Sequence, residues 1–334
     1  MEFYGTLGGL CRDRALLVRL FRAGMTGARL NLSHTSLSQC SALLEEHFFP
    51  AARQAGVDRP HLIIDLQGPE LRLGTLPIPI PIKTGDDILL GQDGLPVPQV
   101  VVSSAKPGDQ ISIDDSAILL EVKKASSSVL LCRVLQGGTL HSRKSLAILG
   151  VYPDTPVLTQ EDLMNLDLAG QFGVTHILQP FVRGQEDIRA LRQALDQRGL
   201  GRIQIMAKIE NRQGLDHLEE IISAADQLCI ARGDLGNSMP LWELPGVQKD
   251  IARRCVAAGR DFCLVTQLLW SMEHRPVPTR AEVSDIYNGV LDGAASLMLT
   301  GETAAGKYPV QAMEYLVKTA RSALQDLERG IVES

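Results

Sequence analysis

Short apolar runs alternate with longer amphipathic stretches along most of this chain, which is the pattern of strands that are each followed by a helix. The segment Ile203–Gly236 shows it most clearly, with an apolar strand, an amphipathic helix over Asn211–Ala224 and a second strand over Gln227–Ala231. Both strands are apolar enough to be buried on two faces, as the strands of a parallel sheet are. The pattern therefore predicts a parallel sheet covered by helices.

Eight such strand–helix units can be counted along the chain. The predicted strands are Glu2–Leu7, Ala28–Leu32, Leu62–Leu66, His176–Gln179, the run that begins at Ile203, Gln227–Ala231, Asp261–Thr266 and Ser296–Leu299. The predicted helices are Arg14–Ala23, Ser36–Ala55, Gln160–Gln171, Gln185–Gln197, Asn211–Ala224, Pro240–Ala258, Thr279–Asp292 and Tyr308–Leu327. Eight units close a (β/α)8 barrel, in which the chemistry lies at the carboxyl ends of the strands.

The alternation is interrupted between the third strand and its helix. There the sequence changes to short β runs separated by turn residues, which predict a small all-β insert. The predicted β runs are Ile88–Gly91, Val100–Ser104, Gln110–Ile113, Ala117–Val122 and Ser128–Val134. We therefore expect an α/β protein in which residues 1–70 and 150–334 form a (β/α)8 TIM barrel and residues 71–149 form a β lid domain.

Composition narrows the class of protein. The 334 residues are 45% hydrophobic, enough for a core, and the net charge of −6 gives no general attraction to nucleic acid. No apolar run approaches the roughly 20 residues that span a bilayer, and the first residues do not resemble a secretory signal. The six cysteines are scattered without a C-x-x-C pair. We therefore expect a cytoplasmic protein with reduced thiols, without nucleic-acid or membrane partners.

The candidate chemistry lies where the two strands of the clearest segment end. Lys208 and Glu210 are two residues apart, so their side chains point to the same side of a strand. The next strand ends at the sequence R-G-D, which brings Asp234 to the same edge. Two carboxylates beside an ammonium suggest a Mg²⁺ or Mn²⁺ site with a neighbouring cation. An ion network that only closes the strand ends fits the same spacing.

Nine motifs in the same order resemble the pyruvate kinase family. They are GARLNLSH (Gly27–His34), IIDLQGPELRLG (Ile63–Gly74), ISIDD (Ile111–Asp115), SRK (Ser142–Lys144), AKIEN (Ala207–Asn211), ARGDLG (Ala231–Gly236), TQLLWSM (Thr266–Met272), PTRAEVSD (Pro278–Asp285) and LTGETAAGKYPV (Leu299–Val310). The resemblance implies a (β/α)8 barrel, a β lid after the third strand and a carboxyl-terminal α/β domain. We expect the third domain to be absent, because the chain ends where it would begin.

The resemblance implies transfer of a phosphoryl group from phosphoenolpyruvate to ADP, which gives pyruvate and ATP in glycolysis. Lys208 would stabilise the phosphoryl group, and Arg29 would contact the substrate phosphate. Glu210 and Asp234 would hold Mg²⁺ or Mn²⁺. The backbone at Gly233 and Asp234, together with the Thr266 hydroxyl, would bind the substrate carboxylate.

The resemblance also implies a monovalent-cation site and a nucleotide site. A K⁺ site would be formed by Asn31, Ser33, Asp65 and the carbonyl of Leu66. In this family a glutamate at the position of Glu70 accompanies K⁺ dependence, so we expect K⁺ activation. The nucleotide phosphates would be bound by Arg72 and Lys144 with His34 nearby, and Asp115 on the lid would face the active site.

Several positions depart from the family pattern and leave two other interpretations open. The departures include Gln67, Pro180 and the lid exit at Ser145, Ala147 and Leu149. One alternative is a truncated paralogue that binds a ligand or a partner without turnover. The other is a different pyruvate enzyme that uses the same metal–enolate chemistry. Without the third domain, we expect no effector control and at most a homodimer formed through barrel helices.

Overall fold

A computed structural model describes residues 1–33, 35–114, 116–151 and 153–332. The chain forms two compact units. The first comprises Met1–Gly68 and Val157–Ser334, and the second comprises Pro69–Pro156. The second unit thus extends a few residues beyond the expected 71–149 at each end.

The first unit contains a closed barrel of eight strands, and every neighbouring pair runs parallel. The strands are β1 (Glu2–Thr6), β2 (Gly27–Asn31), β3 (His61–Asp65), β11 (His176–Gln179), β12 (Gln204–Ile209), β13 (Gln227–Ala231), β14 (Phe262–Val265) and β15 (Ser296–Leu299). They follow one another around the barrel in chain order, and β15 closes it against β1. The predicted (β/α)8 barrel is therefore confirmed.

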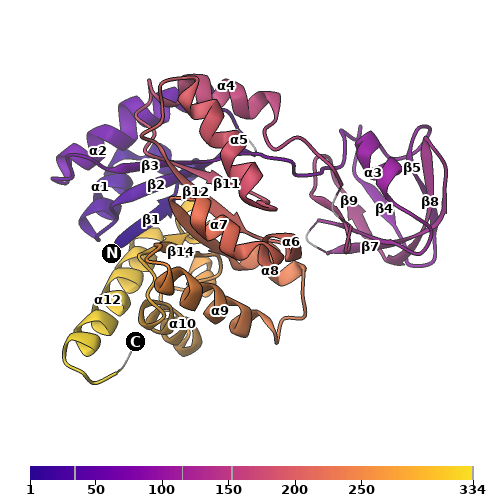
Figure 1. The fold of residues 1–334 in the computed structure, drawn as a ribbon. Coiled ribbons are helices and arrows are strands. Elements are labelled where there is room, and N and C mark those ends of the chain that lie inside the picture. Colours follow the sequence, from indigo (N-terminus) through magenta and orange to yellow (C-terminus); the bar gives the residue numbers. More distant parts are fainter. Residues whose placement is uncertain (34, 115, 152, 333–334) are drawn as a thin grey trace. The chain divides into compact units, whose positions relative to one another are not determined.

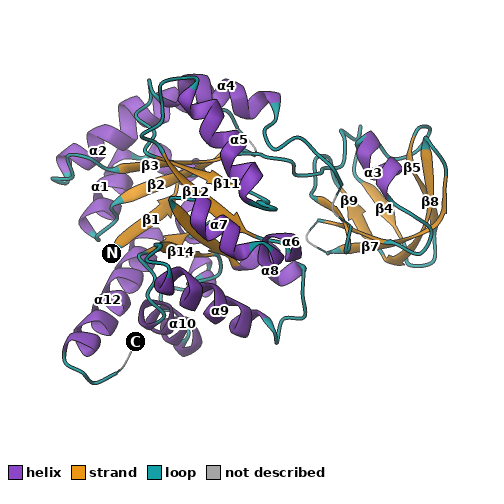
Figure 2. Ribbon diagram, viewed as in Figure 1, coloured by secondary structure: helices purple, strands orange, loops and turns teal. Residues whose placement is uncertain are grey.

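Helices surround the barrel strands, as Figures 1 and 2 show. The longer ones are α1 (Arg14–Arg22), α4 (Gln160–Ala169), α5 (Gln185–Asp196), α7 (Leu218–Ala224), α9 (Leu244–Ala257), α10 (Arg280–Leu291) and α12 (Pro309–Glu328). Among the described residues the unit also has the shorter α-helices α2 (Phe49–Gln54), α6 (Arg212–Asp216), α8 (Arg232–Asn237) and α11 (Gly301–Ala304), and 3-10 helices over Gly9–Arg12 and Trp270–Glu273. The short helix α8 follows β13 without a loop, which matters for the site described below.

Strand alternation sorts the apolar side chains of the barrel into two cores. On β12, Ile205, Ala207 and Ile209 belong to the cluster that packs against the helices. Met206 belongs instead to a separate cluster with residues from other barrel strands, so the barrel is filled by side chains. Lys208 has the same parity as Met206, and the strand thus presents its ammonium above this filled interior.

The predicted helix Ser36–Ala55 is interrupted. The structure has a 3-10 turn over Ser38–Cys40, a π-helical turn over Leu43–Phe48 and then α2. Pro50 lies at the start of α2 and has no backbone N–H, so a regular α-helical hydrogen bond is missing at this point. A widened π turn before the proline is consistent with that loss.

The predicted helix Asn211–Ala224 is also divided. Asn211 caps α6, because its side chain accepts a hydrogen bond of 2.8 Å from the Gly214 N–H. The helix then ends at His217, whose backbone is not helical (φ −111°, ψ 23°), and α7 starts at Leu218. The apolar periodicity of the two pieces is similar, which explains why the sequence reads as one helix.

The second unit consists mainly of antiparallel strands. A five-stranded sheet is formed by β10 (Leu146–Ile148), β6 (Gln110–Ile113), β7 (Ile118–Ala125), β8 (Val129–Gln136) and β5 (Asp87–Gly91). A two-stranded sheet pairs β4 (Ile80–Ile82) with β9 (Gly138–Leu140). The unit has its own apolar core, distinct from the two cores of the barrel.

The predicted β run Val100–Ser104 is wrong, because this segment is the helix α3 (Gln99–Ser104). Its three consecutive valines have a high β propensity, but Val101 and Val102 are both buried in the core of the second unit. Alternating strand geometry would point these two neighbours to opposite faces. Packing therefore overrides the local preference.

All six cysteines are buried and free of disulfide bonds. Among the described residues, no helix has the length and apolarity that crossing a membrane requires.

Candidate active site

Lys208 and Glu210 form the centre of the site, at the carboxyl end of β12. The Lys208 Nζ lies 2.7 Å from the Glu210 Oε1 and 3.5 Å from the Oδ2 of Asp65, which ends β3. These side chains are 14%, 0% and 4% exposed. The expectation that residues two apart on the strand point to the same side is confirmed for Lys208 and Glu210, since their charged groups meet.

Arg29 joins the same cluster from β2. Its Nε and Nη2 both donate to the Asp65 Oδ2, at 2.9 and 2.6 Å. Its Nη1 donates to the Thr6 hydroxyl at 3.1 Å. The structure therefore brings Arg29, Asp65, Lys208 and Glu210 together at the carboxyl ends of three barrel strands, where (β/α)8 enzymes carry their chemistry.

Burial and neighbouring charges shift the pKa values of Lys208 and Glu210. Burial alone would lower the pKa of the Lys208 ammonium, but Asp65, Glu210 and Asp234 outweigh burial and raise the pKa above its ordinary value. Burial raises the pKa of Glu210 to about 8, and the charge of Lys208 opposes that increase. Lys208 therefore stays charged, while the Glu210 carboxylate remains short of positive partners.

The charges of this cluster do not balance, and a bound cation would compensate the excess of carboxylates. Its three carboxylates (Asp65, Glu210 and Asp234) outnumber its two cations (Lys208 and Arg29). The buried Asp65 Oδ1 also accepts no hydrogen bond from the described residues, and the Glu210 Oε1 has the Lys208 ammonium beside it at 2.7 Å. A network that only closed the strand ends would leave fewer carboxylate oxygens without donors, so this donor set fits metal ions better.

Glu210 and Asp234 are the candidate ligands for a divalent ion. The Glu210 Oε2 accepts a hydrogen bond of 2.9 Å from the Phe181 N–H, which fixes the orientation of the carboxylate. Asp234, in the first turn of α8, lies close enough to raise the pKa of both Lys208 and Glu210. No group of three or more His, Cys, Asp and Glu side chains in the described ranges is arranged for a metal. Mg²⁺ often takes only one or two protein carboxylates, so two suffice.

The candidate K⁺ ligands lie at the ends of β2 and β3. Asn31 and Asp65 are paired residues in the register of these two strands. The Asn31 Oδ1 accepts a hydrogen bond of 3.1 Å from the Ser33 N–H, and the Leu66 N–H is bound to the Leu178 carbonyl at 3.2 Å. The unpaired Asp65 Oδ1 adds a carboxylate oxygen, so the set offers hard oxygen donors of the kind that alkali cations prefer.

Thr266 and Gly233 meet at the ends of β14 and β13. The Gly233 N–H donates to the Thr266 Oγ1 at 2.9 Å, and that hydroxyl donates to the Val265 carbonyl at 2.6 Å. Helix α8 begins at Arg232, so the amides of Gly233 and Asp234 lie in its first turn. Such amides have no partner within the helix and can receive a carboxylate.

Two predicted nucleotide ligands lie in the second unit and two are outside the described residues. Arg72 donates to the Glu70 Oε2 through Nε (2.9 Å) and Nη2 (2.6 Å), and to the Arg143 carbonyl through Nη1 (2.8 Å). The Lys144 Nζ lies 2.9 Å from the Asp114 Oδ1. His34 and Asp115 are not among the described residues, so their predicted roles stay predictions.

Sequence reasoning missed three contributions to the site. The Phe181 N–H that holds Glu210 is a backbone group and has no signature in the sequence. Arg232 contacts the Thr266 carbonyl and is itself bound by Asp285; the two residues lie within the ARGDLG and PTRAEVSD motifs, but no role was inferred for them. Glu302, in the LTGETAAGKYPV motif, accepts hydrogen bonds from the backbone N–H groups of Leu269 and Thr300, so its role is structural.

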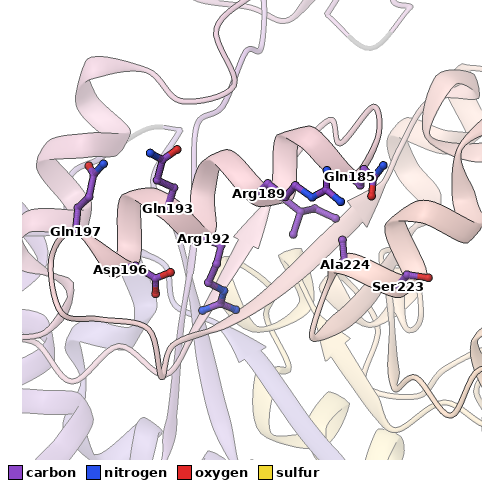
Figure 3. Close-up of a pocket in the computed structure, with 9 residues that line it drawn as sticks. Gln185, Arg189, Arg192, Gln193, Asp196, Gln197, Ser223 and Ala224 are labelled. Atoms are coloured by element: carbon purple, nitrogen blue, oxygen red, sulfur yellow. The ribbon is translucent and has the colours of Figure 1, made fainter.

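A recess of about 590 Å³ lies elsewhere on the first unit, beside α5 and α7 (Figure 3). Its cations are already compensated, since Arg189 pairs with Glu186 and Arg192 pairs with Asp226. Arg192 also donates to the carbonyls of Gly201 and Ile203. The lining of this recess has no buried carboxylate comparable to Asp65 and Glu210 of the strand-end cluster, so it is the weaker candidate for chemistry.

The pyruvate kinase barrel-domain model matches residues 2–313, most of the chain and all eight barrel strands. The chain belongs to the pyruvate kinase family. Pyruvate kinase from Aeropyrum pernix is 35% identical over 330 residues, which cover 98% of this chain and 71% of that protein. Pyruvate kinase from Chlamydia muridarum is 37% identical over 337 residues, which cover 97% of this chain and 68% of that protein. The family resemblance of the nine motifs is thereby confirmed.

The chain does not span the full length of these relatives. It covers 54% of the pyruvate kinase from Bacillus licheniformis, which is 35% identical over 320 residues. The matched region of the pyruvate kinase family is the barrel domain, which carries the Lys208 cluster and the Thr266 turn.

Proposed function

We propose that this protein transfers the phosphoryl group of phosphoenolpyruvate to ADP and releases pyruvate and ATP. The observation that carries the proposal is the buried cluster of Lys208, Glu210, Asp65 and Arg29 at the barrel strand ends. Membership of the pyruvate kinase family supports the same chemistry.

Phosphoryl transfer depends on positive charge around the moving group and on alignment of donor and acceptor, more than on covalent chemistry. Lys208 can supply that charge because the surrounding carboxylates keep its ammonium protonated. Arg29 adds a second cation, held in place by two hydrogen bonds to Asp65. We propose that Lys208 stabilises the transferring phosphoryl group and that Arg29 binds the substrate phosphate.

The substrate carboxylate would be bound by the backbone N–H groups of Gly233 and Asp234 and by the Thr266 hydroxyl. These groups lie at the first turn of α8, where the Gly233 N–H donates to the Thr266 Oγ1 and would be shared with a bound carboxylate. A carboxylate anchored at one end of a small substrate fixes the position of the phosphate at the other end. This anchoring lowers the entropic cost of reaching the transition state.

Two ion sites complete the proposal. Glu210 and Asp234 would hold Mg²⁺ or Mn²⁺, and Asn31, Ser33, Asp65 and the Leu66 carbonyl would hold K⁺. When bound, the divalent ion would stabilise negative charge that develops on the enolate oxygen. Phe181 would keep Glu210 oriented through its N–H, and the carboxylate excess of the cluster would favour both ions.

Arg72 and Lys144 of the second unit are the proposed ligands for the nucleotide phosphates, with His34 and Asp115 as further candidates. Each of the two basic residues is paired with a carboxylate, Glu70 or Asp114. Both side chains remain partly exposed, at 20% and 42%, so phosphate oxygens can reach them. The guanidinium of Arg72 suits phosphate because its planar donors match the spacing of two oxygens.

A second candidate function is ligand binding without turnover. It is favoured by the departures at Gln67 and Pro180, which lie next to functional positions. The Pro180 ring approaches Gly68 so closely that a Cβ there would lie 2.6 Å from the Pro180 Cγ. Pro180 also precedes Phe181, which orients Glu210, so this corner of the site differs from the family pattern where the metal ligand is held.

A coupled assay separates the two candidates. Pyruvate formation should require phosphoenolpyruvate, ADP, Mg²⁺ and K⁺, and Lys208→Met should reduce kcat by about a thousandfold or more, as expected for loss of a transition-state charge. Lys249→Met is the matched control, because Lys249 forms an exposed salt bridge on α9. A wild-type protein that binds phosphoenolpyruvate in calorimetry but forms no pyruvate would favour the second candidate.

A further inference from the structure

The loop after β14 begins with two residues in a rarely populated backbone conformation. Thr266 has φ of 72° and Gln267 has φ of 54°. This left-handed region is uncommon for any residue with a side chain and is a true outlier for a β-branched one such as threonine. Conformations of this kind persist only where surrounding contacts hold them, and they are concentrated at functional sites.

Arg232 supplies such a contact to the Thr266 carbonyl. Its Nη2 donates to the Thr266 carbonyl oxygen at 2.6 Å, and its Nη1 donates to the Asp285 Oδ2 at 2.6 Å. Arg232 is the first residue of α8, Asp285 lies on α10, and Thr266 follows β14. The Arg232 side chain is 11% exposed and the Asp285 side chain 34%, so water is largely excluded from the guanidinium but reaches part of the carboxylate.

The first turn of α8 therefore holds Thr266 at two points. The Arg232 side chain binds the carbonyl, and the neighbouring Gly233 N–H binds the hydroxyl at 2.9 Å. The hydroxyl donates to the Val265 carbonyl at 2.6 Å, and a bound substrate carboxylate would replace that carbonyl as its acceptor. Together these contacts fix both the peptide plane and the side chain of Thr266.

We propose that Arg232 and Asp285 are positioning residues that hold Thr266 in its strained conformation, so that its hydroxyl faces the substrate carboxylate. The inference rests on the proposed function, because it assigns Thr266 to phosphoenolpyruvate. Asp285 accepts a hydrogen bond from the Arg232 Nη1 and so orients the guanidinium. In this orientation the Nη2 reaches the Thr266 carbonyl. An ion pair that served only to join α8 and α10 would need no contact with a strained carbonyl.

The chemistry of arginine makes this role testable. A planar guanidinium presents donors in a fixed fork and can bridge Asp285 and the Thr266 carbonyl at once. A lysine keeps the charge but carries its three donors on one nitrogen, so Arg232→Lys should lose the hydrogen bond to the carbonyl or the one to the carboxylate. Asp285→Ala should have a similar effect, because it removes the group that orients the fork.

The test measures phosphoenolpyruvate binding by calorimetry in the presence of Mg²⁺. Arg232→Lys and Asp285→Ala should each weaken this binding by about tenfold, the factor expected for loss of one charge-assisted hydrogen bond. The KM for ADP should change by less than about twofold, because the turn does not contact the nucleotide in this proposal. Asp292→Ala is the matched control, since Asp292 caps the same helix α10 and forms a 2.6 Å ion pair with Lys249.

A double-mutant cycle with Thr266→Ala decides whether Arg232 acts through Thr266. If it does, Arg232→Lys should weaken binding much less in the Thr266→Ala background than in the wild type. Equal effects in both backgrounds, or a lower melting temperature with unchanged phosphoenolpyruvate affinity, would overturn the inference. The cycle measures binding and not turnover. A wild type that binds phosphoenolpyruvate without forming pyruvate would therefore refute the proposed turnover, and the cycle would still test the role of Arg232. A wild type that does not bind phosphoenolpyruvate contradicts both.

Discussion

Glu210 is fully buried, has a positive partner at 2.7 Å, and still has a pKa raised by burial to about 8. The pair is therefore incomplete, because one ammonium cannot replace the water that the carboxylate loses on burial. A bound dication would supply the missing positive charge. Glu210 is therefore the residue that distinguishes a metal site from an ion network that only closes the strand ends. The protonation of Glu210 then sets how the site responds to pH.

Metal binding should release the proton of Glu210. Below the pKa of about 8 the proton competes with Mg²⁺, so the affinity should fall by roughly tenfold for each unit of decreasing pH between 8 and 6. Calorimetric titration with Mg²⁺ at several pH values measures this slope. Glu273→Gln is the control, since burial also raises the pKa of that carboxyl but it lies outside the cluster. An affinity that does not vary across this range would show that Glu210 is not a ligand.

His176 controls a different pH response, at the amino-terminal end of the barrel. Burial, with a smaller effect from His61, lowers its pKa to about 4, and the residue is 4% exposed. Since the unfolded chain binds this proton near pH 6.5, the folded protein should lose about 3 kcal/mol as pH falls from 6.5 to 4.

The histidine prediction is checked by urea unfolding at pH 7 and pH 4. His176→Gln should lose less of its free energy of unfolding over this interval than the wild type, although its stability at pH 7 is lower because a 2.8 Å contact with Thr175 is changed. Identical losses in both proteins would assign the acid sensitivity to other groups.

At the scale of elements, strands were easier to predict than helices. The bounds of His176–Gln179, Gln227–Ala231 and Ser296–Leu299 are those that the sequence predicted, because buried parallel strands are short apolar runs with polar residues at both ends. Helix continuity was not predictable from periodicity alone. The breaks at Pro50 and His217, and the helix at Gln99–Ser104, depend on local hydrogen bonds and on burial in a distant core.

The site, like the fold, was predictable only in part. Strand periodicity indicates which side chains share a side, whereas contacts that depend on the path of a loop have no signature in the sequence. Lys208 and Glu210 could be placed together because side chains two apart on a strand share a side. Their contact with Asp65 required the order of strands around the barrel, which the count of eight units made predictable. The Phe181 amide and the Arg232 fork could not be found, since each depends on the path of a loop.

Asp162 on helix α4 accepts hydrogen bonds from the chain both where it leaves the first unit and where it returns to it. Asp162 accepts hydrogen bonds from the N–H groups of Gln67 and Gly68 at 2.9 and 3.1 Å. It also accepts from the N–H and the hydroxyl of Thr159, both at 2.8 Å, as part of a capping box. Gly68 is the last residue before the second unit, and Thr159 comes shortly after that unit ends. The buried Asp162 carboxylate therefore binds both segments of the chain that connect the two units.

Asp162→Asn should lower the free energy of unfolding by about 2 to 3 kcal/mol, because its amide would face N–H donors that need an acceptor. The control is Asp167→Asn on the same helix, where Asp167 is 59% exposed and pairs with Arg198. This control should change stability by less than about 0.5 kcal/mol. Urea unfolding of both variants provides the comparison, and equal effects would contradict the role given to Asp162.

At the scale of the whole molecule, activity should depend on a monovalent cation as well as on Mg²⁺. The buried Asp65 Oδ1 lacks a donor among the described residues and lies at the ends of β2 and β3 beside Asn31. Turnover should therefore be high in K⁺ and fall by tenfold or more in a large organic cation that cannot enter, as expected when one buried charge loses its partner. Steady-state assays in matched chloride salts measure this, and equal rates in K⁺, Na⁺ and the organic cation would refute it.

The fold brings Arg29, Asp65, Lys208 and Glu210 together at the carboxyl ends of three barrel strands that are distant in the sequence. The account depends on Glu210 and Asp234 directing their carboxylates to a shared dication beside Lys208. Anomalous diffraction from crystals grown with Mn²⁺ locates that ion without reference to activity. A peak bound by both carboxylates, near the Lys208 ammonium, is the predicted result. A peak elsewhere on the molecule, or carboxylates that do not share an ion, would contradict it.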